Sequence, residues 1–162
     1  MEKSPTRIHC DDKLLTKFQL FAELNHEELE TLLTQSSTVC HPAGERILSA
    51  GESGHCMFVI LRGTVSVTAQ HEGRTVDLAT LTAGDFFGEV SLVDDGPRSA
   101  DVTATSDCEF LCITRMTLGI LAGLQPGAAI HILAAIGRCL VARLRAGNQK
   151  YMDLILLGRQ SS

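Results

Sequence analysis

Glycines at short intervals through the middle of the chain constrain its fold more than any other feature. From Gly44 to Gly96 they separate runs that are rich in Val, Ile and Thr. β-Branched residues favour strands, and glycine is typical of the turns between strands. Short strands at this spacing predict a β-barrel or a β-sandwich. The runs cover residues 55–63, 64–70, 74–81, 100–106 and 108–115.

Helical periodicity frames this β-rich region on both sides. Apolar residues recur at helical spacing over 14–24, which predicts a first helix. Asn25 and Glu28 form the N-x-x-E pattern of a capping box and predict the start of a second helix. After the strands, a short helix is expected over 116–123 and a long one from 126 to about 157, with a proline in its first turn. The predicted fold class is therefore α+β.

These patterns divide the chain into three parts. Residues 1–10 show no periodicity and are predicted to form a flexible arm. Residues 11–125 hold the leading helices and the β-rich domain, and residues 126–162 hold the long helix and a tail. A chain of 162 residues with 44% hydrophobic content can bury one core and carry an appended helix.

The long helix carries apolar and small residues in alternating steps of four and three, which is typical of a heptad seam. A lone helix of this length favours a partner helix, so we predict a homodimer through it. Alternatively one face packs on the β-rich domain, as expected for Ile130, Ile132, Ile136 and Cys139, and the two arrangements are compatible. The seam comprises Leu133, Gly137, Leu140, Leu144, Gly147, Tyr151, Leu154 and Gly158.

Composition narrows the classes of function. A net charge of -5 and a pI near 5.6 argue against a chain that binds nucleic acid by its own electrostatics. No apolar run approaches the roughly 20 residues of a membrane span, and no signal peptide is evident, so a soluble, cytoplasmic protein is expected. The six cysteines form no CxxC pair, which indicates reduced core thiols and no metal site.

The stretch TAGDFFGEVSLVDDGPRSADVTA, residues 82–104, combines a turn, a short helical segment and an arginine. Gly88 and Glu89 open a helical turn whose free amides can bind an anion. Arg98 follows Pro97, and a guanidinium can bind two phosphate oxygens at once. The pattern indicates a cradle for one phosphate, in which the carboxylate needs a separate hydrogen-bond donor such as a sugar hydroxyl. Alternatively the glutamate only complements the helix dipole and the arginine is a solvated loop residue.

The order of two helices, a glycine-punctuated β-region, this loop and a long closing helix resembles the cyclic nucleotide-binding domain family. That family includes catabolite activator protein and the regulatory subunits of cyclic-AMP-dependent protein kinase. The resemblance covers about residues 21–145 and is most specific in the phosphate-binding cassette, matched by FGE at 87–89 and PRSA at 97–100. It implies an antiparallel, jelly-roll-like β-roll of about eight strands with N-terminal helices and a long C-terminal helix.

The resemblance also implies a role for each cassette residue. Arg98 would pair with the exocyclic oxygens of the cyclic phosphate, and Glu89 would accept the ribose 2′-hydroxyl. Ser99 favours cyclic AMP, since members that prefer cyclic GMP often carry Thr there, but cyclic GMP stays an alternative. Val76 and Leu78, with Phe87 and Val90, are candidates for the apolar wall around ribose and base, although core packing explains them equally. The implied binding residues are Phe87, Gly88, Glu89, Val90, Ser91, Arg98, Ser99 and Ala100.

In this family the final helix closes over the base. The base-contacting position falls near Arg143, with Arg138 as the alternate, and an arginine can stack on a purine. Alternatively both are solvated. The chain stops with LILLGRQSS, so no DNA-binding output domain is expected and the signal would pass to a partner protein. The sequence thus predicts a cyclic nucleotide sensor that is not an enzyme and needs no cofactor. The alternatives are a ligand-free scaffold that retains the fold and a cyclic nucleotide hydrolase, for which the cassette offers no base or metal ligand.

Overall fold

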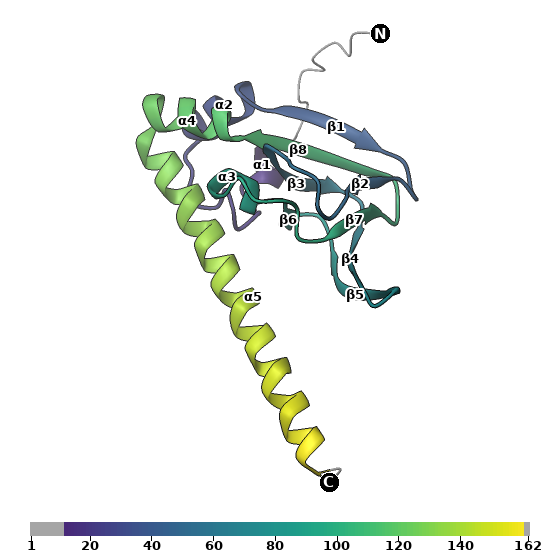
Figure 1. Cartoon of the computed structure of the whole chain (residues 1–162). Helices are drawn as coiled ribbons and strands as arrows, with labels where there is room; N and C mark the ends of the chain where they lie inside the picture. Colours follow the sequence, from purple (N-terminus) through teal and green to yellow (C-terminus); the bar gives the residue numbers. More distant parts are fainter. Residues whose placement is uncertain (1–11, 161–162) are drawn as a thin grey trace.

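Eight strands form two antiparallel four-stranded sheets in the computed structural model, which describes residues 12–160. The first sheet has the strand order β1-β8-β3-β6 and the second the order β2-β7-β4-β5. The sheets pack as a β-roll beside one long helix (Figure 1), which confirms the predicted α+β, jelly-roll-like fold. The predicted arm, residues 1–10, lies outside the described residues. The strands are β1 (Ser37–His41), β2 (Arg46–Leu48), β3 (Cys56–Arg62), β4 (Val65–His71), β5 (Arg74–Leu81), β6 (Phe86–Phe87), β7 (Asp101–Ala104) and β8 (Cys108–Thr114).

The helices agree with the prediction except at the first. The capping box of α2 is present, because Asn25 Oδ1 accepts from the Glu28 amide at 2.9 Å and Glu28 Oε2 accepts from the Asn25 amide at 3.2 Å. The first helix ends at Leu15, and residues 16–23 form successive turns whose amides bond three residues back. Apolar residues three apart fit such turns as well as a helix, which is why the periodicity was misleading. The helices are α1 (Asp12–Leu15), α2 (His26–Thr34), α3 (Val90–Val93), α4 (Arg115–Leu124) and α5 (Pro126–Gln160).

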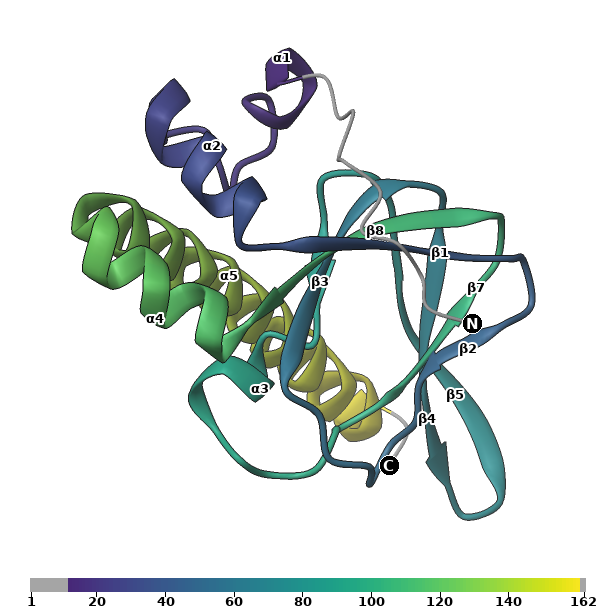
Figure 2. The ribbon, with the colours of Figure 1, turned by 90° about the horizontal axis from the view of Figure 1, so that it is seen from above.

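Strand β3 separates two hydrophobic cores. Met57 and Val59 face the helices, whereas Phe58 and Ile60 face the second sheet. Burial on both faces explains why this strand reads as a continuous apolar run rather than an alternating one. Seen from above, α1 and α2 lie on one side of the molecule and the β4–β5 hairpin projects on the other (Figure 2).

Helix α5 packs on the domain only through its N-terminal half. Ile132 and Ile136 are buried, and Cys139 and Leu140 pack partly against the same core. Ile130 is 65% exposed, so its expected packing on the domain was wrong, because a residue two positions from Ile132 lies on the opposite side of a helix. Residues 141–154 are all exposed, and the C-terminal end of the helix extends beyond the β-roll (Figure 1).

By length and composition alone, α5 is apolar enough to cross a membrane. This corrects the expectation that no stretch of the chain approaches a span, which considered only uninterrupted apolar runs. One such helix is weak evidence, since helices of soluble proteins meet the same criterion.

We expect the two isoleucines on opposite faces of α5 to differ in their effect on stability. Ile132→Ala should lower the free energy of unfolding by about 2–5 kcal/mol, because it leaves a cavity in the core. The matched change Ile130→Ala should stay within about 0.5 kcal/mol, because that side chain is exposed. Urea unfolding of both variants checks this, and equal destabilisation would contradict the assigned faces.

Candidate functional site

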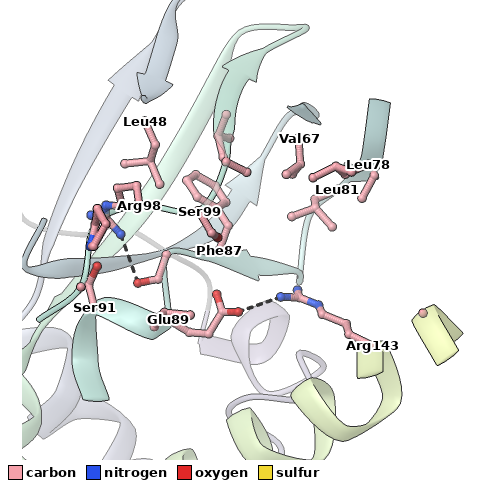
Figure 3. A pocket seen from close by; sticks show the side chains of 18 of the residues that line it. Leu48, Val67, Leu78, Leu81, Phe87, Glu89, Ser91, Arg98, Ser99 and Arg143 are labelled. Atoms are coloured by element: carbon pink, nitrogen blue, oxygen red, sulfur yellow. Dashed lines mark hydrogen bonds and ion pairs between the residues drawn. The ribbon is translucent and has the colours of Figure 1, made fainter. Parts of the chain in front are cut away.

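A cavity of about 520 Å³ lies between the β-roll, residues 88–100 and α5 (Figure 3). We call residues 88–100 the cassette loop. The strands supply an apolar wall, while the cassette loop and α5 supply the charged groups. The wall includes Leu48, Val67, Leu78, Leu81, Phe87 and Val102, and the polar lining includes Glu89, Ser91, Arg98, Ser99, Arg143 and Lys150.

The start of the cassette loop is fixed by strand pairing. Phe87 pairs with Phe58 of β3, and their rings stack with centroids 5.2 Å apart. Gly88 then adopts a φ of 78°, a conformation that glycine takes without steric cost, and so turns the chain from β6 into α3. Glu89 is thereby placed at the start of α3 with its side chain in the cavity.

Arg98 is held at the other end of the loop by neutral acceptors. Its Nη1 donates to the Gly88 carbonyl at 3.2 Å and its Nη2 to the Cys56 carbonyl at 3.1 Å. Its backbone is fixed as well, since its amide donates to Glu52 O and its carbonyl accepts from the Gly51 amide, both at 2.8 Å. Within residues 12–160, no carboxylate forms an ion pair with Arg98. The cavity therefore contains an oriented cation whose charge is not cancelled by a neighbour.

Two glycines make room for this guanidinium. A Cβ at Gly54 would overlap the Arg98 guanidinium, and one at Gly88 would lie 2.7 Å from Nη1. From the sequence, Gly54 was expected only to be a turn residue. No local pattern indicates that it makes room for the Arg98 guanidinium. The Cys56 thiol lies in the same environment, where burial raises its pKa and the charge of Arg98 partly opposes that shift.

Glu89 is bound by the last helix rather than by Arg98. Arg143 Nη1 lies 3.0 Å from Glu89 Oε1, and its Nη2 donates to the Phe86 carbonyl at 2.9 Å. The Arg143 guanidinium also lies 5.2 Å from the centroid of the Phe86 ring. Glu89 is only 7% exposed, so this pair supplies the counter-charge that a buried carboxylate needs. The cassette loop and α5 are thus joined through one ion pair.

The remaining predicted residues fall into two groups. Those of the cassette, together with Leu78, line the cavity. Val76 does not line it and is 44% exposed, because it pairs with Ala69 nearer the hairpin turn. Arg138 also lies elsewhere, 3.7 Å from Glu23. Ala146, Gly147 and Lys150 also line the cavity and were not predicted from the sequence, although they follow Arg143 at helical spacing.

The cysteines and acidic residues offer no metal centre in the described part of the chain, where no group of three or more His, Cys, Asp or Glu side chains is placed to hold an ion. The described thiols are free, and burial raises the pKa of Cys112 to about 12. Cys40 is exposed and so departs from the expectation of core thiols.

Comparison with known proteins identifies the class to which this fold and site belong. The family model described as the cyclic nucleotide-binding domain matches residues 38–122, and the chain belongs to that family. A cyclic AMP receptor protein from Thermus thermophilus is 34% identical over 137 residues, which are 84% of this chain and 61% of that protein. A cGMP-dependent protein kinase from Caenorhabditis elegans is 34% identical over 112 residues, 67% of this chain and 14% of the kinase.

Solved structures of this family share the fold of the chain. A cyclic nucleotide-binding domain from Methylobacillus flagellatus superimposes with a TM-score of 0.77 at 26% identity, covering 86% of this chain and 79% of that one. The chain spans about three fifths of the length of the CRP-like regulators that it matches, 61% and 63% for two of them.

We expect Gly54→Ala to impair the site without unfolding the protein. The Gly54 backbone does not need the left-handed region, so alanine is tolerated there, but its methyl group takes the place of the guanidinium. Affinity for a cyclic nucleotide, the ligand class of the family, should fall about tenfold, the equivalent of one oriented hydrogen bond. Calorimetric titration measures this change. In an Arg98→Ala background the same substitution should have no further effect, and an additive loss would contradict the link between the two residues.

Proposed function

We propose that this chain is a sensor that binds a 3′,5′-cyclic purine nucleotide, with cyclic AMP as the preferred ligand. The observation that carries the proposal is the charge arrangement of the cavity. Arg98 has no carboxylate partner among the described residues, and Glu89 is a buried carboxylate in the same cavity. A cyclic nucleotide needs both, a cation for its phosphate and an acceptor for its one free ribose hydroxyl.

Each part of such a ligand has a complementary group in the cavity. The phosphate would bind Arg98 and the amides near Gly88, Ser91 and Ser99. The ribose 2′-hydroxyl would donate to Glu89, and the sugar and base would contact the apolar wall. Val90 and Ala100 complete the lining of the cassette loop. Arg143 is the proposed base lid, and Arg138 is no longer a candidate, because it lies against Glu23.

Ser99 supports the choice of cyclic AMP, since a threonine is common at this position where cyclic GMP is preferred. The names of the relatives include both a cyclic AMP receptor protein and a cGMP-dependent kinase, so both nucleotides enter the test.

The ion pair between Glu89 and Arg143 suggests how binding is transmitted. A ribose hydroxyl on Glu89 would change the contact that joins the cassette loop to α5, and so shift the position of that helix. A coupling of about 1–3 kcal/mol suffices for a graded response. We propose a regulatory, non-enzymatic role in the cytoplasm, with output through a partner protein rather than through direct contact with nucleic acid.

Titration calorimetry tests the proposal directly. We expect micromolar or tighter binding of cyclic AMP and weaker binding of cyclic GMP. Arg98→Ala should weaken binding at least about 30-fold, because it removes a charged partner of the phosphate inside the cavity. The matched change Arg62→Ala, at the exposed end of β3, should leave the affinity unchanged. If neither nucleotide binds, or if Arg98→Ala changes nothing, the sensor function is wrong and the ligand-free scaffold remains.

We also propose that two chains associate through the exposed half of α5. Leu144, Tyr151 and Leu154 of the predicted seam are 65%, 66% and 68% exposed, which supports burial against a second helix. Leu140 and Gly147 serve the chain's own domain instead, since Leu140 packs on its core and Gly147 lines the cavity.

Sedimentation equilibrium should therefore give twice the chain mass of 17.5 kDa at micromolar concentration. Leu154→Asp should shift the protein to the monomer, because it places a charge in the seam. Leu156→Asp makes the same change two residues away, on the other side of the helix, and should leave the dimer intact. A wild-type protein that sediments as a monomer would contradict the dimer.

A further inference from the structure

We propose that Arg115 is a positioning residue for the nucleotide site, which holds the outer part of the cassette loop in place without contacting the ligand. The inference rests on the proposed nucleotide binding and adds a residue that the sequence motif does not contain. Arg115 is the first residue of α4 and does not line the cavity.

The guanidinium of Arg115 contacts the cassette loop at two points. Its Nη2 donates to the Ser91 carbonyl at 3.0 Å, and its Nη1 lies 2.8 Å from Asp95 Oδ1. One guanidinium therefore contacts both α3 and the segment that follows it. A guanidinium suits this role, because its donors lie in a fixed plane and hold two acceptors in one geometry.

The cassette loop has few other anchors in this region. Leu92 packs into the core, and the Arg98 backbone pairs with Gly51 and Glu52. Between them, the amide of Asp94 bonds to Val90 and that of Gly96 to the Asp94 side chain, both inside the loop. Among the described residues, Arg115 makes the one polar contact that joins residues 93–97 to the rest of the molecule.

Arg115 itself is well anchored. It follows Thr114, whose Oγ1 caps α4 by accepting from the Thr117 amide at 3.0 Å. Thr117 is buried, and its hydroxyl donates to the Gln35 carbonyl at the end of α2 at 2.9 Å. The first turn of α4 is thus fixed to β8 and α2, so it is a rigid base from which Arg115 can orient the cassette loop.

The contact matters for binding because of where Ser91 lies. Ser91 is buried and lines the cavity, two residues after Glu89. Releasing its carbonyl would loosen both α3, which carries the carboxylate, and the segment leading to Arg98. The groups that bind the phosphate and the ribose would then no longer be held at a fixed separation. Part of the binding free energy would be spent on ordering these groups.

The test is the affinity and dissociation rate of cyclic AMP for the full chain carrying Arg115→Gln. We expect the Kd to rise about tenfold, as for other orienting contacts one step removed from a ligand, with most of the change in faster dissociation. The Tm of the protein without nucleotide should shift by no more than about 4 °C, which separates positioning from a general loss of stability. Arg62→Gln is the matched control, with the same chemical change at an exposed position.

Two further variants separate the contacts of Arg115. Asp95 is 86% exposed, so Asp95→Asn should change the affinity by no more than about threefold. The charge swap Arg115→Asp with Asp95→Arg restores an ion pair but not the bond to the Ser91 carbonyl. Its affinity for cyclic AMP should therefore be as low as that of Arg115→Gln. Full recovery in the swap, or unchanged affinity in Arg115→Gln, would overturn the inference. Failure of the wild-type chain to bind cyclic AMP or cyclic GMP would instead overturn the proposed function.

Discussion

The site depends on a cation held by neutral groups. Arg98 donates to the carbonyls of Gly88 and Cys56, so the guanidinium is oriented while no carboxylate among the described residues pairs with it. A carboxylate in place of these carbonyls would bind the arginine more strongly but would also neutralise it. The missing side chain of Gly54 leaves the space that this arrangement needs. Two segments that are distant in sequence, residues 54–56 and the cassette loop, therefore combine to keep one positive charge available.

The negative charge of Glu89, unlike the positive charge of Arg98, has a charged partner. Glu89 and Arg98 belong to the same loop, yet the glutamate pairs with Arg143 from α5. Because a buried carboxylate needs a counter-charge, the cassette loop can be closed around Glu89 only when α5 is in place. Arg143 also follows the last residue of α5 that packs on the core, Leu140, and precedes the half that extends from the domain. The ion pair thus lies between the part of α5 that packs on the core and its exposed part, which is where the proposed transmission would act.

What could be predicted from the sequence are features whose cause is local. The β-runs, the capping box of Asn25 and the spacing of the cassette depend on residues close together in the chain, and the structure has the strands and the cap as expected. The first helix failed because spacing of three residues does not separate a helix from successive turns. The cradle of Gly54 and the contact of Arg115 could not be predicted, because each depends on a segment at least 20 residues away along the chain. The apolar wall was predicted only in part, since a β-bulge after Val67 decides which residues of β5 face the cavity.

The apolar character of α5 is best understood from its contacts with the domain. One stripe of the helix packs on the core as far as Leu140, and the same side then lines the cavity through Arg143, Gly147 and Lys150. A segment that covers a polar cavity cannot also lie in the hydrocarbon of a bilayer, because its charged groups would lose both water and their partners. The exposed leucines of this half are better matched to another helix, because a helical seam buries a single stripe of α5.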